Sequence, residues 1–309
     1  MNDSLFFKFI VPILTLLLIG CNSSINKEGE TVTVDFSDHA QIVSTRAFSD
    51  SAEHLNVAVA AMISPKETFV FYEDLFNYIS SKTGDQVVFK QRKTYDEVNK
   101  MLENKEVDLA VICSGAYVSG KEKSKMEILV TPVSNGKNNY QAYVVVHVNS
   151  PYKQLSDLQN KVFAFSDPIS HSGKFYIEKR IKELGYGSNF FSKTIYSNAH
   201  DVSMQLVSKQ VVDGSSVKGT IYDYLEKFHP ERIKNLRIIE KSEWYGMPPI
   251  VVPEDLDEQK KEQLRNLFLK IHEDPEGKKI LDQILIDKFV IGSDQDYNSI
   301  RSILTTSAE

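Results

Sequence analysis

The sequence has little of what a disulfide-rich, nucleic-acid-binding or metal-binding protein needs. It contains two cysteines, Cys21 and Cys113, too few for a disulfide framework. The formal net charge is −6 and no Lys/Arg-rich block occurs, which argues against nucleic acid as a partner. Neither a His-Glu-x-x-His nor a Cys-x-x-Cys spacing is present. We therefore predict no metal site and no cofactor.

Sequence signatures of common enzyme classes are also missing. There is no Gly-x-Ser-x-Gly nucleophile elbow and no Gly-x-x-x-x-Gly-Lys loop for nucleotide phosphates. Ser172 follows a histidine, but nothing in the sequence supplies an oriented third member of a catalytic triad. The sequence therefore predicts that the protein is not an enzyme.

Long apolar runs are confined to the N-terminus. Residues 5–20 form one that is short for a membrane span and typical of a secretory signal. It ends in Leu-Ile-Gly-Cys at residues 18–21, which resembles the lipobox of bacterial lipoproteins. That resemblance implies a signal peptide over residues 1–20 and lipidation of Cys21, which would anchor the chain to a membrane. The alternative is a plain secretory signal that happens to contain Cys21.

Polar residues follow the apolar run. Residues 21–52 read as a tether, with a short alternating patch at residues 31–36 that could dock as a strand. From residue 55 onward, apolar strand patterns alternate with amphipathic helix patterns. This alternation predicts an α/β protein with parallel, doubly wound sheets.

Two segments break the alternation and divide the folded part into lobes. The β-rich run at residues 139–148 and the proline-flanked run at residues 248–253 are suited to crossing between lobes. We expect lobe 1 over residues 53–138 and 247–309, and lobe 2 over residues 139–246. Two doubly wound α/β lobes joined by two crossover strands would close on a small solute by hinge motion. The alternative architecture is a two-domain α/β enzyme.

The most informative local pattern lies at residues 162–173. An apolar strand runs into an Asp-Pro turn, which delivers Ser170, His171 and Ser172 to the start of a helix. The first turn of a helix carries unpaired backbone N–H groups and a partial positive charge, so it favours anions. The alternative is that Ser170 or Ser172 merely caps the helix.

Several stretches together resemble the phosphate/phosphite/phosphonate-binding proteins of ABC importers, within the type II periplasmic binding proteins. The matching stretches are residues 93–98, 107–117, 140–146, 155–168, 170–173, 211–213 and 289–301, together with His200. The resemblance implies that a phosphoryl group is held by Tyr95, Tyr140, Ser170, His171, Ser172 and His200. We expect helix dipoles and imidazoles, rather than an arginine, to supply the positive potential.

Two departures from the family bear on the ligand. His171 stands where the family often has threonine, and Thr220 and Pro248 stand where relatives that bind aminoethylphosphonate have acidic residues. A buried ammonium without a carboxylate is costly. The resemblance therefore implies phosphate, phosphite or a simple phosphonate as the ligand.

The expected function follows from these points. We expect an extracytoplasmic lipoprotein, periplasmic or on the outer face of the cell membrane. It would capture a small phosphorus oxyanion for the permease and ATPase of an ABC importer. A sensor lipoprotein that uses the same cleft is the alternative, and a cleft enzyme is a weaker one.

Overall fold

The computed structural model describes residues 40–42 and 53–307 of the chain, with side chains described over residues 53–305. The predicted signal peptide, Cys21 and the patch at residues 31–36 lie outside the described residues. Of the predicted tether, only strand β1 (Ala40–Ile42) is described. In the described part, no helix combines the length and the apolar character needed to cross a membrane.

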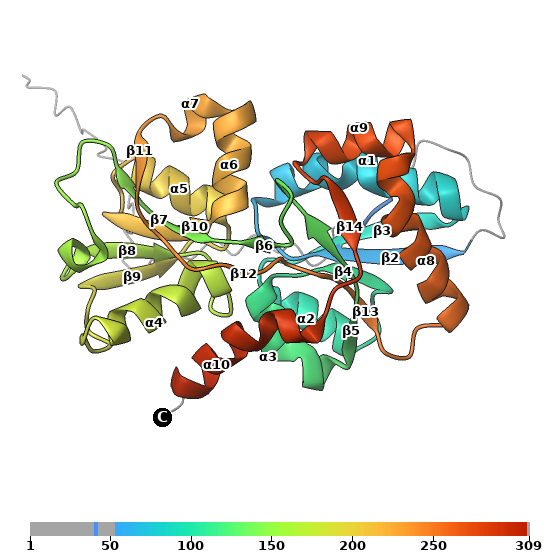
Figure 1. Cartoon of the computed structure of the whole chain (residues 1–309), viewed down its shortest axis with the longest axis horizontal. Coiled ribbons are helices and arrows are strands. Elements are labelled where there is room, and N and C mark those ends of the chain that lie inside the picture. Colours follow the sequence, from blue (N-terminus) through green and yellow to red (C-terminus); the bar gives the residue numbers. More distant parts are fainter. Residues whose placement is uncertain (1–39, 43–52, 308–309) are drawn as a thin grey trace, which may run out of the picture. The chain divides into compact units, whose positions relative to one another are not determined.

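The larger sheet has seven strands in the order β1-β3-β2-β4-β13-β5-β14 (Figure 1). β2 lies parallel to β3 and β4, whereas β13 lies antiparallel to β4 and β5. The prediction of a parallel sheet is therefore correct at β2–β4 and wrong around β13. Besides β1, the strands are β2 (His54–Val59), β3 (Gln86–Gln91), β4 (Leu109–Val111), β5 (Met126–Val133), β13 (Ile250–Pro253) and β14 (Lys288–Val290).

The second sheet has five strands in the order β11-β7-β10-β8-β9. β8 lies parallel to β9 and β10, and β7 lies antiparallel to β10 and β11. Every residue of β7 is buried, and this strand lies inside the sheet between β10 and β11. The strands are β7 (Ala142–His147), β8 (Val162–Phe165), β9 (Lys193–Tyr196), β10 (Gly214–Lys218) and β11 (Leu236–Lys241).

The two connections between the sheets pair with each other. β6 (Asn139–Tyr140) and β12 (Tyr245–Gly246) form a two-stranded antiparallel ribbon in which Tyr245 lies opposite Tyr140. The predicted crossovers thus occur, although the second one starts before the proline pair. Since β6 leads directly into β7, this ribbon places Tyr140 between the two sheets.

Helices flank both sheets (Figure 1). Their ends follow local chemistry: α2 begins with a capping box between Thr94 and Glu97, and α1 ends where Gly84 adopts a left-handed conformation. The larger sheet is accompanied by α1 (Pro65–Thr83), α2 (Tyr95–Glu103), α3 (Ser114–Ser124), α8 (Glu258–Lys270), α9 (Pro275–Gln283) and α10 (Asn298–Ser307), and the second by α4 (Tyr176–Glu183), α5 (His200–Ser208), α6 (Gly219–Phe228) and α7 (Pro230–Ile233). The structure is thus α/β, as predicted.

Candidate functional site

A tight turn after β8, over residues 166–173, carries the two serines that were predicted to bind an anion, and we call it the serine turn. Ser170 caps the π-helical turn that follows, because its Oγ accepts a hydrogen bond of 3.1 Å from the backbone N–H of Gly173. Its O–H hydrogen stays available for donation. Ser172 is equally buried, and its Oγ has no hydrogen-bond partner in the protein. The capping alternative therefore applies to Ser170, whereas the hydroxyl of Ser172 is free to bind a ligand.

Gly173 is required for this turn. A Cβ atom at this position would lie 1.7 Å from Oγ of Ser166 and 2.8 Å from Oγ of Ser170. No side chain can occupy that space without displacing the serines. The Ser-x-Ser-Gly pattern thus has a packing reason as well as a chemical one.

Asp167 ties the serine turn to α2. Its carboxylate accepts hydrogen bonds from the backbone N–H of Ile169, at 2.9 Å, and from that of Tyr95, at 3.0 Å. The second bond joins α2, which lies beside the larger sheet, to the turn that follows β8 of the second sheet. It fixes the first residue of α2 beside that turn. Tyr95 is fully buried, and its pKa is raised mainly by that burial, so its phenol remains a protonated donor. The phenolic oxygen has no partner in the protein.

Tyr140 approaches the same place from the crossover ribbon. It is 1% exposed, and its phenolic oxygen also lacks a partner. Burial raises the pKa of Tyr140, and the nearby hydroxyls of Ser172 and Ser114 offset that rise in part. The phenol is therefore protonated at neutral pH and lies next to the free hydroxyl of Ser172.

His200 is the first residue of α5, and hydrogen bonds fix both its backbone and its ring. Its backbone N–H donates to the carbonyl of Met62 at 2.9 Å, and its Nδ1 accepts from the backbone N–H of Lys218 at 3.3 Å. Nε2 is buried without a partner. Burial, with a smaller contribution from the charge of Lys218, lowers the pKa of His200 to about 3. The ring is thus neutral at pH 7, and its Nε2 carries the hydrogen.

His171 lies in the turn but makes different contacts. Its ring packs edge-on against Tyr245, with centroids 3.9 Å apart, and lies 6.4 Å from the ring of Tyr140. Both ring nitrogens are buried without a partner. Burial lowers its pKa to about 3, and the charges of Glu243 and Lys179 act on it more weakly. A role for His171 in ligand contact stays a prediction.

Tyr95, Tyr140 and His171 lie near the start of α3. Cys113 precedes this helix and lies near enough to Tyr95, Tyr140 and Lys218 to affect their pKa values when it is ionised. Burial raises the pKa of Cys113, so the thiol is uncharged at neutral pH. We call the unpartnered groups Tyr95 Oη, Tyr140 Oη, Ser172 Oγ and His200 Nε2 the donor cluster. Each is a neutral donor, and an oxyanion is the ligand that such groups satisfy together.

Lys218 was missed by the sequence analysis. It ends β10 and precedes α6, and its Nζ lies 5.8 Å from the centroid of the Tyr140 ring. Desolvation lowers the pKa of Lys218 to about 8, so its ammonium is still mostly charged at pH 7. Because the imidazoles of His171 and His200 are neutral, the positive charge at the site comes from this lysine. The expected contribution of the imidazole N–H groups stays a prediction, and this lysine adds a full positive charge that the sequence analysis did not include.

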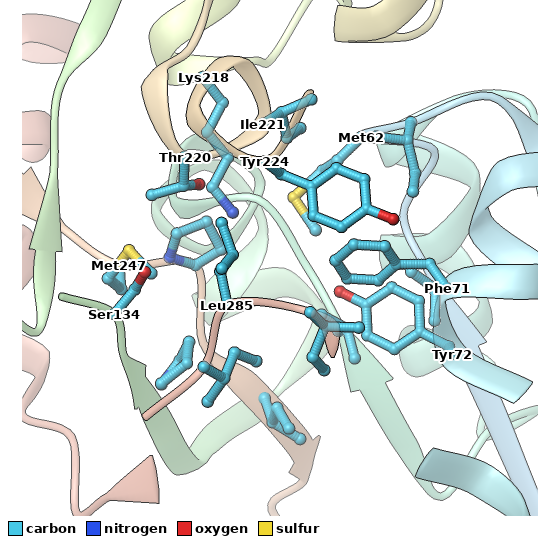
Figure 2. Close-up of a pocket in the computed structure, with 18 of the residues that line it drawn as sticks. Met62, Phe71, Tyr72, Ser134, Lys218, Thr220, Ile221, Tyr224, Met247 and Leu285 are labelled. Carbon is cyan, nitrogen blue, oxygen red and sulfur yellow. The ribbon is translucent and has the colours of Figure 1, made fainter. Parts of the chain in front are cut away.

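An apolar cavity of about 80 Å³ borders Lys218 (Figure 2). The view shows the ammonium of Lys218 projecting into it beside Thr220. Pro248 also lines the cavity, and no aspartate or glutamate does. Its lining also includes Met62, Phe71, Ser134, Tyr224, Met247 and Leu285. The two positions singled out in the sequence, 220 and 248, thus lie at one cavity.

The chain matches a known protein family by its sequence. Residues 57–297 match the family described as "ABC transporter, phosphonate, periplasmic substrate-binding protein". The chain is 26% identical over 181 residues to the phosphonates-binding periplasmic protein of Escherichia coli, an alignment that covers 56% of this chain and 52% of that protein. The chain thus spans about half the length of this relative. It is 23% identical over 246 residues to the probable ABC transporter phosphite binding protein PhnD1 of Prochlorococcus marinus, covering 76% and 77% of the two chains.

Solved structures share the fold. A binding protein component of an ABC phosphonate transporter from Pseudomonas aeruginosa superposes with a TM-score of 0.78 at 22% identity, over 83% of this chain and 87% of that one. PhnD1 of Prochlorococcus marinus, solved in complex with methylphosphonate, superposes with a TM-score of 0.76 at 18% identity, over 83% and 98%. The predicted type II periplasmic-binding-protein fold is confirmed.

Proposed function

The chain belongs to the family of periplasmic substrate-binding proteins of ABC phosphonate transporters, and from this premise we propose that it captures a small phosphorus oxyanion outside the cytoplasm. Phosphate, phosphite and simple phosphonates fit the proposal. The bound ligand would be handed to a permease and its ATPase for import. Since the relatives named above are binding proteins, we expect no catalysis.

The observation that carries the proposal is the donor cluster. Four neutral donors come from α2, β6, the serine turn and α5, and none has a partner in the protein. A hydrogen bond from a neutral donor to a charged acceptor contributes about 1.5–3 kcal/mol, more than a neutral pair does. Such a cluster is costly to bury unless a ligand accepts its hydrogens. A tetrahedral oxyanion offers acceptors in several directions at once.

Closure of the lobes over the ligand is the proposed mechanism. Hydrogen bonds already join the two sheets' elements near the cluster: Tyr95 N–H to Asp167, and Ser64 N–H to the carboxylate of Asp201 at 2.8 Å. The backbone N–H of His200 reaches Met62 in the same way. These bonds form only when the lobes are together, so the ligand and the lobe contacts would stabilise the same state.

The cavity beside Lys218 bears on the ligand class. Its lining offers a ligand ammonium no carboxylate, and Lys218 would repel it. We therefore expect aminoethylphosphonate to bind more weakly than methylphosphonate. This supports the ligand class expected from Thr220 and Pro248.

Membrane attachment is proposed from the sequence alone. We propose that Cys21 is lipidated and that the tether holds the binding domain at the membrane surface. One acyl chain binds only marginally, whereas two or three anchor durably. The anchor would keep the protein near the permease.

A calorimetric screen tests the proposed function. The purified chain is titrated with phosphate, phosphite, methylphosphonate, aminoethylphosphonate and sulfate. We expect at least one phosphorus oxyanion to bind, and methylphosphonate to bind more tightly than aminoethylphosphonate. A preference for sulfate, or for the amine-bearing ligand, would contradict the proposal, as would the absence of binding to every phosphorus compound.

A further inference from the structure

Lys218 places a charged side chain at a mostly apolar cavity, which is an unfavourable position for a lysine. It is the last residue of β10, its Nζ lies 5.8 Å from the centroid of the Tyr140 ring, and its side chain lines the apolar cavity (Figure 2). Most of the cavity lining is apolar, including Phe71, Met247 and Leu285. Lys218 is half-buried, so an ammonium in such surroundings loses part of its hydration and has little to replace it.

No protein group neutralises this ammonium within the described residues. No carboxylate oxygen lies within 4.0 Å of its Nζ among the described ion pairs. The charged or titratable groups that act on Lys218 are the Cys113 thiol and the His200 imidazole, both uncharged at neutral pH. The ring of Tyr140 adds only a weak cation–π contact, because its centroid lies 5.8 Å from Nζ of Lys218. Lys261, the buried lysine of the described residues, is by contrast paired with Glu127 at 3.2 Å. Lys218 is therefore a half-buried cation without a carboxylate partner among the described residues.

The phosphoryl group does not need Lys218. The donor cluster already offers hydroxyl and imidazole hydrogens from both lobes, and Ser170 has a further hydroxyl hydrogen to give. The ammonium, by contrast, points into the cavity next to Thr220. The donor cluster therefore faces one part of the site, and the ammonium of Lys218 faces a second part, the neighbouring cavity.

We propose that Lys218 binds a second anionic group of the ligand, so that the preferred ligand is a phosphonate that carries a carboxylate on a short carbon chain. The carbon chain would lie against Met247, Pro248 and Leu285, and Thr220 would donate its hydroxyl to the same carboxylate. This inference rests on the proposed function, since it takes the phosphoryl group as bound by the donor cluster.

The size of the cavity sets the length of the chain. An apolar cavity of about 150 Å³ accommodates benzene. The cavity here measures about 80 Å³, which suits a substituent of a few non-hydrogen atoms. Phosphonoacetate, with one methylene between phosphorus and carboxylate, is the matching probe. Methylphosphonate is its counterpart without the carboxylate.

The test compares these two ligands by calorimetry in the wild-type chain and in Lys218→Met. Lys241→Met is the matched control, because this lysine also ends a strand of the second sheet but contacts the Tyr143 ring, 4.3 Å from its centroid. We expect wild type to prefer phosphonoacetate. In Lys218→Met, phosphonoacetate should lose about ten- to a hundredfold in affinity, the range of one charge-assisted contact, while methylphosphonate changes less than about threefold. Lys241→Met should match wild type.

A pH series adds a second readout. Because the pKa of Lys218 is lowered to about 8, the wild-type advantage over Lys218→Met for phosphonoacetate should shrink as pH rises through that value. The ratio of the two proteins' affinities cancels the titration of the ligand itself. If Lys218→Met fails to fold, Lys218→Gln, which keeps a polar end, replaces it.

The outcomes separate the inference from the proposed function. Equal weakening of both ligands in Lys218→Met would mean that the lysine neutralises the phosphoryl group, which overturns the inference alone. Wild type that binds methylphosphonate but prefers it over phosphonoacetate also overturns the inference alone. Failure of every phosphorus ligand to bind would overturn both.

Discussion

The backbone N–H of Lys218 donates to Nδ1 of His200 over 3.3 Å, and this bond determines which imidazole nitrogen carries the hydrogen. A neutral imidazole that accepts at Nδ1 must hold its hydrogen on Nε2. Nε2 is the buried nitrogen without a protein partner. The end of β10 thus orients a neutral donor for the ligand.

We predict that His200 acts as a neutral donor. His200→Ala should weaken methylphosphonate binding about ten- to a hundredfold, whereas His200→Gln, which retains an N–H, should lose less. His229→Gln, at an exposed histidine, serves as the control. If glutamine is as damaging as alanine, or if the ratio of wild-type to glutamine-variant affinity changes between pH 6.5 and 8, the imidazole is not a neutral donor.

Acid should destabilise the protein partly through His200. Its pKa is about 3 when buried but about 6.5 in an unfolded chain, so only the unfolded chain takes up a proton as pH falls below 6.5. The stabilisation is complete above pH 6.5 and is lost as pH falls toward 3. At pH 5 the free energy of unfolding of wild type should have dropped by about 2 kcal/mol more than that of His200→Gln. Denaturant titrations at pH 7 and pH 5 measure this, and parallel pH dependences would refute it.

Ser172 should contribute to binding rather than to folding. Its hydroxyl has no protein partner, whereas the hydroxyl of Ser215, also buried, donates to the carbonyl of Ala164 at 2.9 Å. Ser172→Ala should therefore weaken methylphosphonate binding about tenfold or more with little change in unfolding free energy. Ser215→Ala should show the opposite pattern, a loss of about 1 kcal/mol in stability with near-normal binding. Equal behaviour of the two variants would remove Ser172 from the site.

Gly115 should be necessary for closure. A Cβ atom there would lie 2.4 Å from the carbonyl oxygen of Ile169 and 2.6 Å from the backbone nitrogen of His171. Both are backbone atoms of the serine turn, so Gly115→Ala should hold α3 and the turn apart and weaken binding. Gly187→Ala, where a Cβ would meet nothing within 4 Å, is the control. Small-angle scattering should show ligand-induced compaction in wild type and control, but less in Gly115→Ala; identical compaction in all three would exclude this role.

The lipid anchor can be tested separately from the site. Wild type should partition into the detergent phase of a Triton separation, and Cys21→Ser should remain unprocessed or stay in the aqueous phase. Wild type confined to the aqueous phase would leave the plain secretory signal as the correct interpretation. Ligand affinity should be the same for both proteins.

The sequence was most informative where periodicity and turn chemistry agree. The strand–Asp-Pro–Ser-x-Ser-Gly segment predicted the turn that brings Ser170 and Ser172 to a helix start, because Gly173 and the cap at Ser170 are local features. The antiparallel placement of β13 could not be foreseen, since a run of four apolar residues carries no information about direction. The direction of β13 is set by its pairing with β4 and β5, which are far away in the sequence.

The charges of the site residues could not be predicted from the sequence either, because they also depend on tertiary packing. A lysine before Gly-Thr reads as an exposed helix start, and nothing local shows that Lys218 ends in an apolar cavity. Likewise, the burial that makes His171 and His200 neutral comes from residues far away in the chain. A pattern can place a histidine at a site, but the packing around it determines its charge.

The most direct test of the central claim is a crystal structure of the chain grown with methylphosphonate. The account predicts the phosphoryl oxygens within hydrogen-bond distance, about 2.6–3.2 Å, of Tyr95 Oη, Tyr140 Oη, Ser172 Oγ and His200 Nε2, with the methyl group toward the cavity beside Lys218. Methylphosphonate bound elsewhere, or bound with its oxygens on Lys218 and away from the donor cluster, would contradict it.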